Sequence, residues 1–311
     1  MEKNKTAKTI IAICIITLFV AIALYIYTHP SYEGDVFIPA EPSPSETAAV
    51  DIHMLDVGEG LSVFIDAGEY EVLIDGGYAK YGEYISGYIK QYIDGDIEYI
   101  ISTHSDSDHV GGLTQIYRDY QVNHTIYGDT GKSQQYKNFE EAARDEPGST
   151  FENDKDEVID LGDGVTLKII DVVDDDKKTN NNSVIAFLDI DGYKVLITGD
   201  AEAKTEKLLL GMIGEVDVYV VGHHGSETSS SQAFLDEIRP KYGLISSEGP
   251  EEKYNNPDED VMRRLLSFGT TIYATYRSGE IIATIDYGEI YLSPPESEKL
   301  TLENYRIKAA A

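Results

Sequence analysis

The sequence is poor in cysteine, tryptophan and basic side chains. Its 311 residues include one Cys, no Trp, and 25 Lys and Arg against 56 Asp and Glu, which gives a formal net charge of −31. A single Cys excludes a disulfide framework and a cysteine-based zinc cluster. The shortage of Lys and Arg argues against a protein that binds nucleic acid over a broad basic face, because phosphate contacts need clustered cations. Any role in nucleic-acid chemistry must therefore be local.

Apolar residues are present in the amount that a folded domain needs. Hydrophobic residues make up 41% of the chain, and Val, Ile, Leu and Tyr are spread evenly along it. This composition excludes a mostly disordered acidic chain, whose apolar content would be too low to bury a core. The length suits one large domain with additional terminal segments.

One long hydrophobic run lies near the N-terminus. Residues 10–27 contain Thr17 as their only clearly polar member and approach the roughly 20 residues that a bilayer helix needs. Three lysines within residues 1–9 place this basic end in the cytoplasm by the positive-inside rule. A cleaved secretory signal is the alternative, but its apolar core usually has about 7 to 15 residues and ends in small side chains. This run ends in Tyr25-Ile26-Tyr27, so we expect a single-pass transmembrane anchor in the cell membrane, with the remaining chain extracellular.

Composition divides the remaining chain into a linker, one large domain and a tail. Residues 28–49 are rich in Pro, Ser and Glu and have no apolar period, which is typical of a linker. Residues 50–293 hold the strand and helix patterns and form the predicted folded domain. Residues 294–311 begin with two prolines, which should stop strand pairing, and form a C-terminal tail.

Strand patterns dominate the start of the domain and then alternate with helix patterns. Apolar and β-branched runs at 61–66 and 97–102 predict strands, the second of them buried. Residues 203–210 show helical spacing, and 281–292 read as a closing hairpin around a Gly turn. Two half-domains, each a sheet with helices outside, predict an α/β fold built as a four-layer αβ/βα sandwich.

The densest chemistry lies directly after the strand predicted at 97–102. The segment HSDSDH at 104–109 places two His and two Asp within six positions, just before a Gly pair and a helix. Side chains of such a loop can converge in one small volume, and imidazole and carboxylate are ligands of Zn, Mn and Fe. The Gly pair lets the helix N-terminus approach, where its dipole favours an anionic substrate group. The segment therefore predicts a metal site.

These residues resemble the metallo-β-lactamase superfamily and, within it, the hydrolase domain of ComEC-like competence proteins. The similarity covers most of residues 50–292, and its motifs occur in the family order. They are LDVGEG at 55–60 with Ser62, VLIDGG at 72–77, THSDSDHVGG at 103–112, NNNS at 180–183, TGDAE at 198–202 and VGHHGSETS at 221–229. The fold that the resemblance implies agrees with the sandwich predicted from periodicity.

The resemblance also implies a site for two divalent metal ions, Zn or Mn. In chain order the implied ligands are His104 and Asp106 for the first ion, Asp108 and His109 for the second, Asp200 as a bridge between them, and His223. His223 is preferred to His224 only because it comes first off its strand, and the choice between them stays open. A capping role for Asp200 and a buried turn for the histidine pair are the structural alternatives.

Further residues are expected beside the ligands. The second histidine of the pair, taken as His224, is a candidate proton donor to the leaving group or phosphate contact, and Asp108 is the other expected catalytic residue. Asp75 is expected either to orient a ligand histidine or only to shape its Asp-Gly-Gly turn. Ser226 is expected to cap the next helix or to contact substrate. The supporting or substrate-contacting set is Asp75, Asn180, Ser183 and Ser226.

Three positions depart from the superfamily pattern. Asp106 stands where a second His is usual, and no His lies between His109 and Asp200 except His124, which we interpret as structural. Asn256 stands where the ComEC-like pattern carries a His before Pro. A site with fewer imidazoles and more oxygen ligands should bind Zn less tightly and tolerate Mn or Mg better.

The expected function is that of a membrane-anchored, extracytoplasmic, metal-dependent hydrolase that uses a metal-bound hydroxide. The resemblance implies a phosphodiesterase of the nuclease type with single-stranded DNA as substrate in competence, and a membrane pore as partner. The net acidity opposes a polyanionic substrate, unless cations such as Arg144, Lys194 and Lys204 gather at the rim. Lys177 and Lys178 are further candidates for that rim. A cell-surface small-molecule phosphodiesterase or esterase, or a catalytically weak metal-binding protein, remains an alternative.

Overall fold

The computed structural model describes residues 49–172, 179–286 and 288–307. The anchor predicted at 10–27 and nearly all of the linker predicted at 28–49 lie outside these residues. Among the residues that are described, no helix combines the length and the apolar character that a bilayer span requires.

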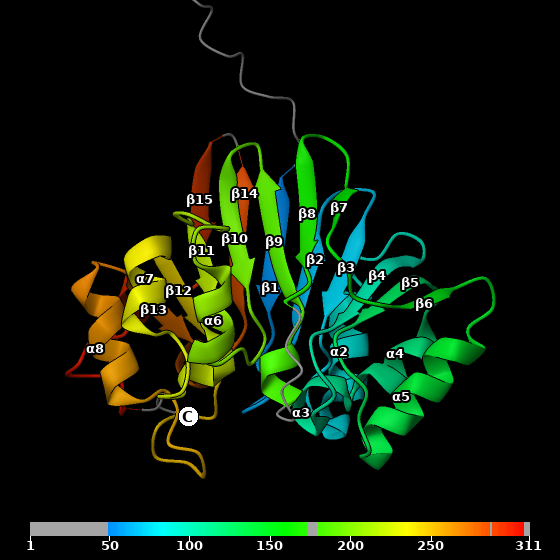
Figure 1. Ribbon diagram of the computed structural model, residues 1–311, viewed down its shortest axis with the longest axis horizontal. Coiled ribbons are helices and arrows are strands. Elements are labelled where there is room, and N and C mark those ends of the chain that lie inside the picture. Colours follow the sequence, from blue (N-terminus) through cyan, green and yellow to red (C-terminus); the bar gives the residue numbers. More distant parts are fainter. Residues whose placement is uncertain (1–48, 173–178, 287, 308–311) are drawn as a thin grey trace, which may run out of the picture. The chain divides into compact units, whose positions relative to one another are not determined.

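Two sheets pack face to face, and helices cover the outer face of each (Figure 1). The first sheet has the strand order β15 (Glu289–Leu292), β14 (Ile281–Asp286), β1 (Val50–Met54), β2 (Val63–Asp66), β3 (Glu71–Ile74), β4 (Ile97–Ser102), β5 (Val122–Tyr127) and β6 (Thr150–Asn153). The second has the order β13 (Thr271–Ala274), β12 (Tyr242–Ile245), β11 (Val218–Val220), β10 (Tyr193–Ile197), β9 (Ile185–Ile190), β8 (Val165–Ile170) and β7 (Glu157–Asp160). The prediction of an αβ/βα sandwich is thus confirmed for the described chain.

The longer helices form the two outer layers. Those on the first sheet are α2 (Gly82–Ile89), α4 (Leu113–Asp119) and α5 (Gln134–Asp145), and those on the second are α6 (Ala203–Leu209), α7 (Gln232–Ile238) and α8 (Glu259–Ser267). Short turns of helix lie in the connections: η1 (Ala79–Tyr81), α3 (Ser107–Val110), η2 (Thr179–Asn182), η3 (Gly222–Gly225), α9 (Thr275–Ser278) and η4 (Glu296–Glu298).

Alternation along the strands separates the central core from the outer ones. Val63 and Ile65 of β2 point into the space between the sheets, where they share a cluster with Leu167 and Ile169 of β8. Phe64, between them on β2, faces the helices of the first sheet. Successive side chains of a strand point to opposite faces. Strand β2 therefore contributes both to the core between the sheets and to the core between its sheet and the helices.

Parallel pairing brings the chemistry to one edge of the sandwich. Strands β3, β4 and β5 run parallel in the first sheet, and β10, β11 and β12 run parallel in the second. Asp75 directly follows β3, His104 follows β4, Asp200 follows β10 and the histidine pair follows β11. Loops at the carboxyl ends of such strands are where α/β folds place their ligands.

Glu71, at the start of β3, is a buried acid that lowers stability and takes no part in the loops at this edge. Glu71 is 1% exposed, and neither of its carboxylate oxygens accepts a hydrogen bond within the described chain. Burial raises its pKa from 4.5 to about 8, helped by the neighbouring Glu98 carboxyl and by the charges of Asp94 and Asp66. Since the folded state then holds a proton that the unfolded chain releases, stability falls as pH rises from 4.5 to 8.

We therefore predict that Glu71→Gln stabilises the protein under alkaline conditions. The substitution removes the buried charge, so thermal unfolding followed by circular dichroism should show a Tm about 2–6 °C above wild type near pH ~8.5. Near pH ~5, where Glu71 is already protonated, the difference should be under about 1 °C. Glu69→Gln, at an exposed neighbouring position, is the matched control. An equal effect at both pH values would contradict the assignment.

Candidate metal centre

The 104–109 segment is held by a close contact between two glycine-containing turns. It connects β4 to the short helix α3, so His104 and Asp106 lie in the connection and Asp108 and His109 lie on the helix. A Cβ placed on Gly112 would stand 2.1 Å from the carbonyl oxygen of Gly76. Only glycine permits that approach, and it joins this segment to the turn that follows β3.

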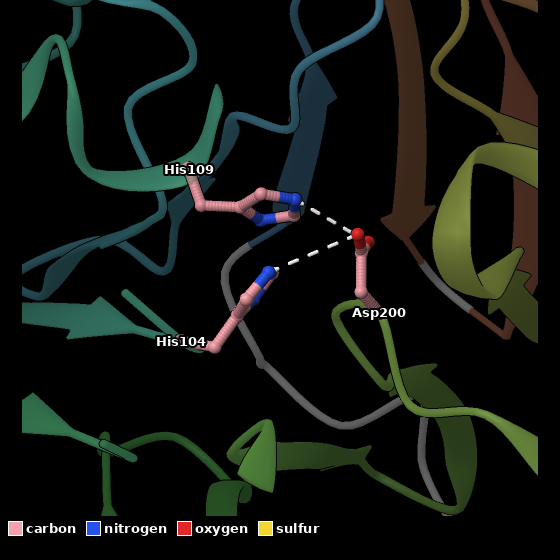
Figure 2. A group of neighbouring side chains, drawn as sticks. All are labelled: His104, His109 and Asp200. Atoms are coloured by element: carbon pink, nitrogen blue, oxygen red, sulfur yellow. Dashed lines mark ion pairs between the residues drawn. The ribbon is translucent and has the colours of Figure 1, made fainter. Parts of the chain in front are cut away.

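Two buried histidines converge on a buried carboxylate (Figure 2). Nε2 of His104 lies 3.8 Å from Oδ2 of Asp200, and Nε2 of His109 lies 3.3 Å from its Oδ1. One ligand-type atom from each of the three residues lies within 4.8 Å of the others. Nε2 of His104, Nε2 of His109 and Oδ1 of Asp200 are buried without hydrogen-bond partners in the described structure. Buried polar atoms without partners are costly, and divalent cations bound among them would satisfy all three.

A second group of ligand-type atoms shares His109. Asp108, His109 and His224 also offer atoms that lie within 4.8 Å of one another. His224 is 5% exposed, and its Nδ1 lies 3.1 Å from the carbonyl oxygen of Ser246. A carbonyl oxygen only accepts hydrogen bonds, so Nδ1 carries the proton and donates it in this hydrogen bond. The lone pair of the ring is then on Nε2, which lies 3.5 Å from Oδ1 of Asp200. His224 is therefore prepared as a ligand.

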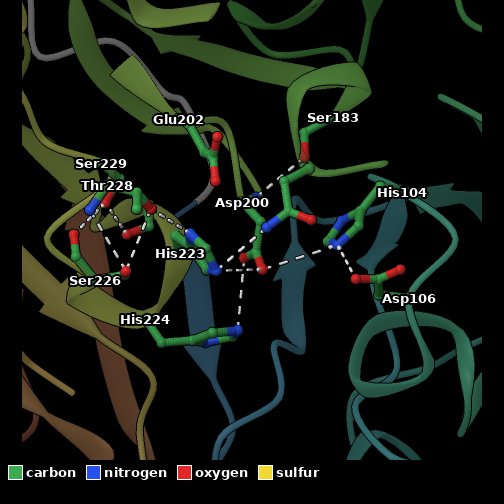
Figure 3. A network of polar contacts seen from close by, with 12 residues as sticks. His104, Asp106, Ser183, Asp200, Glu202, His223, His224, Ser226, Thr228 and Ser229 are labelled. Carbon is green, nitrogen blue, oxygen red and sulfur yellow. Dashed lines mark hydrogen bonds and ion pairs between the residues drawn. The ribbon is translucent and has the colours of Figure 1, made fainter. Parts of the chain in front are cut away.

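His223 occupies a different environment from its neighbour (Figure 3). Its side chain is 22% exposed, and its Nε2 lies 3.6 Å from Asp200 and 3.2 Å from Nδ2 of Asn180. Its Nδ1 lies 2.9 Å from the hydroxyl of Thr228. Both ring nitrogens thus have partners, and neither of the two ligand groups includes this residue. Of the two histidines, His224 is thus the buried one and the one that belongs to a group of ligand-type atoms, whereas the order along the sequence favoured His223 as the metal ligand.

Both histidines of the pair have left-handed backbones, which sequence order could not reveal. The φ angles are 51° at His223 and 56° at His224. Residues other than glycine rarely adopt this conformation, and where they do it is often part of a functional site. The tight turn of η3 makes the second histidine the buried one.

Asp75 orients His109. Its Oδ2 lies 2.6 Å from Nδ1 of His109, and the same carboxylate accepts hydrogen bonds from the backbone N–H and the hydroxyl of Thr103 at 2.8 and 2.6 Å. Asp75 is fully buried. A carboxylate on the far nitrogen fixes the tautomer and the ring direction of a ligand histidine. The structure therefore contains the contact that orienting a ligand histidine requires, and Asp75 also has the left-handed backbone (φ 59°) of its Asp-Gly-Gly turn.

The electrostatics of the cluster suit a cation. Burial raises the pKa of Asp200, but the surrounding imidazoles, His109 first, outweigh burial and hold that pKa well below its usual value. Burial, and then the nearby His109, lower the pKa of His104. Burial also lowers the pKa of His109, but the Asp200 and Asp75 carboxylates outweigh it and raise that pKa well above its usual value. A divalent ion binds an ionised carboxylate and neutral imidazoles, and would displace the proton from His109.

The remaining predicted residues lie at different distances from the cluster. Asp106 is half exposed, with Oδ2 3.8 Å from Nε2 of His104, and it accepts a hydrogen bond from the Thr179 hydroxyl. Ser183 is buried, and its hydroxyl accepts the backbone N–H of Asp200 at 3.1 Å. Ser226 contacts the Thr228 hydroxyl at 3.2 Å and does not line the cavity described below. Asn180 does line that cavity.

The cluster opens into a cavity of about 1010 Å³, here called the metal cavity. Among its lining residues are Asp106, Asp108, Asn180, Asp200, His223 and His224, together with Glu59, Tyr78, Asp129, Lys132, Lys253, Tyr254 and Asn256. The sequence prediction missed the Tyr and Lys residues of this set. The cations expected at the rim, Arg144, Lys194 and Lys204, do not line it, and Lys177 and Lys178 lie outside the described residues.

One sequence signal could have found Lys132. The segment GDTGKS at 128–133 follows β5 and precedes α5, and Ser133 caps that helix by accepting the N–H of Tyr136 at 3.1 Å. A Gly-rich turn with Lys before a helix is a pattern typical of anion contacts. Lys253 and Tyr254 lie in the loop between β12 and α8 and carry no comparable pattern.

Comparison with known proteins agrees with this geometry. The chain is 31% identical over 238 residues to "Recombination protein 2" of Haemophilus influenzae, covering 74% of this chain and 28% of that protein. It is 26% identical over 310 residues to "ComE operon protein 3" of Bacillus subtilis, covering 90% and 37% respectively, and 28% identical over 261 residues to "Competence protein ComA" of Neisseria gonorrhoeae, covering 80% and 34%. The chain thus spans about a third of the length of these relatives.

A solved structure and a family profile bear on the fold. The metallo-beta-lactamase fold protein YhfI of Bacillus subtilis matches with a TM-score of 0.51 at 10% identity, covering 79% of this chain and all of that one. Residues 55–249 match the profile described as "Metallo-beta-lactamase superfamily". The resemblance drawn from the motifs is confirmed, and the chain belongs to the metallo-β-lactamase superfamily, in its ComEC-like branch.

Proposed function

We propose that the protein is a membrane-anchored, extracellular metal-dependent phosphodiesterase of the nuclease type, which cleaves single-stranded DNA during DNA uptake. The main support for a metal-dependent hydrolase is the set of buried His and Asp atoms that lack hydrogen-bond partners and face one another at Asp200. The names of the relatives, which refer to competence and recombination, support DNA as the substrate. The hydrophobic run at 10–27 supports the anchor, and a membrane pore is the proposed partner.

The proposed ligands divide between two divalent ions, Zn or Mn. His104 and Asp106 would hold the first, Asp108, His109 and His224 the second, and Asp200 would bridge them. When bound, two such ions supply a water-derived nucleophile near neutral pH and stabilise the negative charge that develops on phosphate. The mixture of imidazole and oxygen donors suits Zn and Mn, and relatively few imidazoles favour Mn.

The chain's own residues then position this chemistry. Asp75 keeps Nε2 of His109 directed at Asp200, and Ser183 holds the backbone of Asp200. His223 stands at the cavity wall beside Asn180, and in its imidazolium form it would donate the Nε2 proton to the leaving oxygen when the phosphorus–oxygen bond breaks. The two histidines of the pair thus exchange the roles that sequence order had assigned to them.

A small-molecule phosphodiester at the cell surface is the second candidate substrate. Five carboxylates line the metal cavity, at Glu59, Asp106, Asp108, Asp129 and Asp200, against the two lysines Lys132 and Lys253. This balance disfavours a long polyanion more than a small diester.

The test of the proposed function is cleavage of a 5′-labelled single-stranded oligonucleotide by the purified full chain with Mn²⁺ or Zn²⁺, beside bis(p-nitrophenyl) phosphate. We expect cleavage of both, and Asp200→Asn should lower kcat/KM by at least about 100-fold because it removes the bridging carboxylate. Turnover of the small diester alone would favour the second candidate. Absence of both turnover and bound metal would contradict the proposal that the protein is an enzyme.

The histidine pair gives a second prediction. His224→Ala should remove about one of two tightly bound metal equivalents, since it deletes a ligand, whereas His223→Ala should keep both and lower kcat. Metal content after dialysis, measured by inductively coupled plasma mass spectrometry, and steady-state kinetics separate the two outcomes. Loss of metal in His223→Ala with full content in His224→Ala would restore the order expected from the sequence.

A third prediction concerns Asp75. Asp75→Asn keeps the shape of the side chain but weakens its hold on the His109 ring, so metal affinity should fall about 10- to 100-fold. Competition with a fluorescent chelator measures this Kd. Asp160→Asn, at an exposed position on β7, is the matched control. An unchanged Kd for Asp75→Asn would show that Asp75 only shapes its turn.

A further inference from the structure

A second cavity adjoins the metal cavity and shares part of its lining. It has a volume of about 450 Å³ and is here called the side cavity. That size lies within the range of about 300–1,000 Å³ that is usual for small-ligand sites. The two cavities share the lining residues Glu59, Tyr78, Ser107, Lys253 and Tyr254. Because Ser107 lies between Asp106 and Asp108, the side cavity opens directly beside the proposed ligands.

Two tyrosines from distant parts of the sequence border both cavities. Tyr78 follows β3 and Tyr254 precedes α8. Tyr254 is 48% exposed, so its ring is accessible to a ligand that enters either cavity. Burial, and then the charge of Asp108, raise the pKa of Tyr78 above its usual value. The Tyr78 phenol therefore stays neutral beside the metal cavity.

Lysines accompany both rings. The Lys253 ammonium lies 4.3 Å from the centre of the Tyr254 ring and 2.7 Å from its hydroxyl. The Lys80 ammonium lies 5.9 Å from the centre of the Tyr78 ring and also lines the side cavity. The side cavity is lined by these two lysines and by two glutamates, Glu59 and Glu248, so its charges balance, whereas the chain as a whole has 25 basic against 56 acidic residues.

These groups match the chemistry of one unpaired nucleotide. A nucleobase stacks on an aromatic ring whatever its identity, while an ammonium group can contact the adjoining phosphate. Stacking involves no net charge, so it provides affinity that the acidic surface does not oppose. A base inside a duplex has its faces covered by its neighbours and cannot stack on the protein without being unstacked.

We propose that Tyr254, with Tyr78 and Lys253, forms a stacking subsite that positions the nucleotide next to the scissile phosphate. The inference rests on the proposed nuclease function and adds to it the residues that select single-stranded substrate. Tyr254 is thus a positioning and specificity residue, which acts on the base while the metal cavity acts on the phosphate.

The test compares a single-stranded oligonucleotide with an abasic oligomer of the same length, which keeps the phosphates and lacks the bases. For the full chain with Mn²⁺, we expect the ratio of kcat/KM on the normal to the abasic oligomer to fall about tenfold in Tyr254→Ala, mainly through KM, as the loss of one stacked base predicts. Tyr254→Phe should keep most of this ratio, because the ring remains.

Two controls make the result decisive. Tyr291→Ala removes a ring that is 52% exposed on β15 and should leave the ratio at the wild-type value. Thermal unfolding checks that Tyr254→Ala is folded. A wild-type ratio in a folded Tyr254→Ala would overturn the subsite and leave the nuclease intact. If the wild-type protein cleaves neither oligomer, the proposed function falls and the subsite falls with it.

Discussion

The structure depends on one buried carboxylate. Asp200 is 4% exposed, and the Nε2 atoms of four histidines stand around it, at 3.8 Å for His104, 3.3 Å for His109, 3.6 Å for His223 and 3.5 Å for His224. An ionised carboxylate is expensive to bury without compensation. The compensation comes from both sheets at once, since the first two histidines follow β4 and the other two follow β11. The site therefore requires the two sheets of the sandwich to keep one fixed position relative to each other.

Hydrogen bonds between the two half-domains maintain this relative position of the sheets. The Ser246 hydroxyl, after β12, donates to the carbonyl oxygen of Gly60 in the first half at 2.7 Å, and the Val184 N–H donates to the Thr103 carbonyl oxygen at 2.9 Å. Thr103 also donates to Asp75, which holds His109. The chain of contacts thus runs from one sheet to the other through the residues next to the proposed ligands. Displacement of one sheet would move ligand atoms and not only core side chains.

The sequence predicts local features better than it predicts contacts between distant loops. The sandwich follows from strand alternation, and four candidate ligands occur within the six residues 104–109, so both are visible in short windows. The choice between His223 and His224 depends on two consecutive left-handed residues, a conformation that side-chain identity does not signal. Helix α5 was not predicted, although Ser133 caps it and Tyr136, Phe139 and Ala143 are buried on one face.

Tyr254 and Lys253 show the same limit in the candidate site. They become neighbours of Tyr78 only through the fold. More than half of the chain separates them from Tyr78, so no short segment of sequence contains all three residues. Glu59 illustrates it as well, because its carboxylate accepts a hydrogen bond from Asn256, at 2.7 Å. Asn256 is the position where the ComEC-like pattern has a His, and the structure shows the amide engaged with a cavity-lining acid and not with the proposed ligands.

The charges that line the metal cavity imply an order of binding, in which metal ions come before phosphate. Five lining carboxylates against two lysines would repel a phosphodiester. Two divalent ions would add four positive charges among those carboxylates and reverse the sign of the local field. Under the proposed function, metal binding would be a condition for phosphate to enter the cavity, and not only for its hydrolysis. Because this reversal would be confined to the metal cavity, the rest of the acidic surface would still repel DNA, and the bases of the proposed substrate would be the part that the protein can hold without opposing charge.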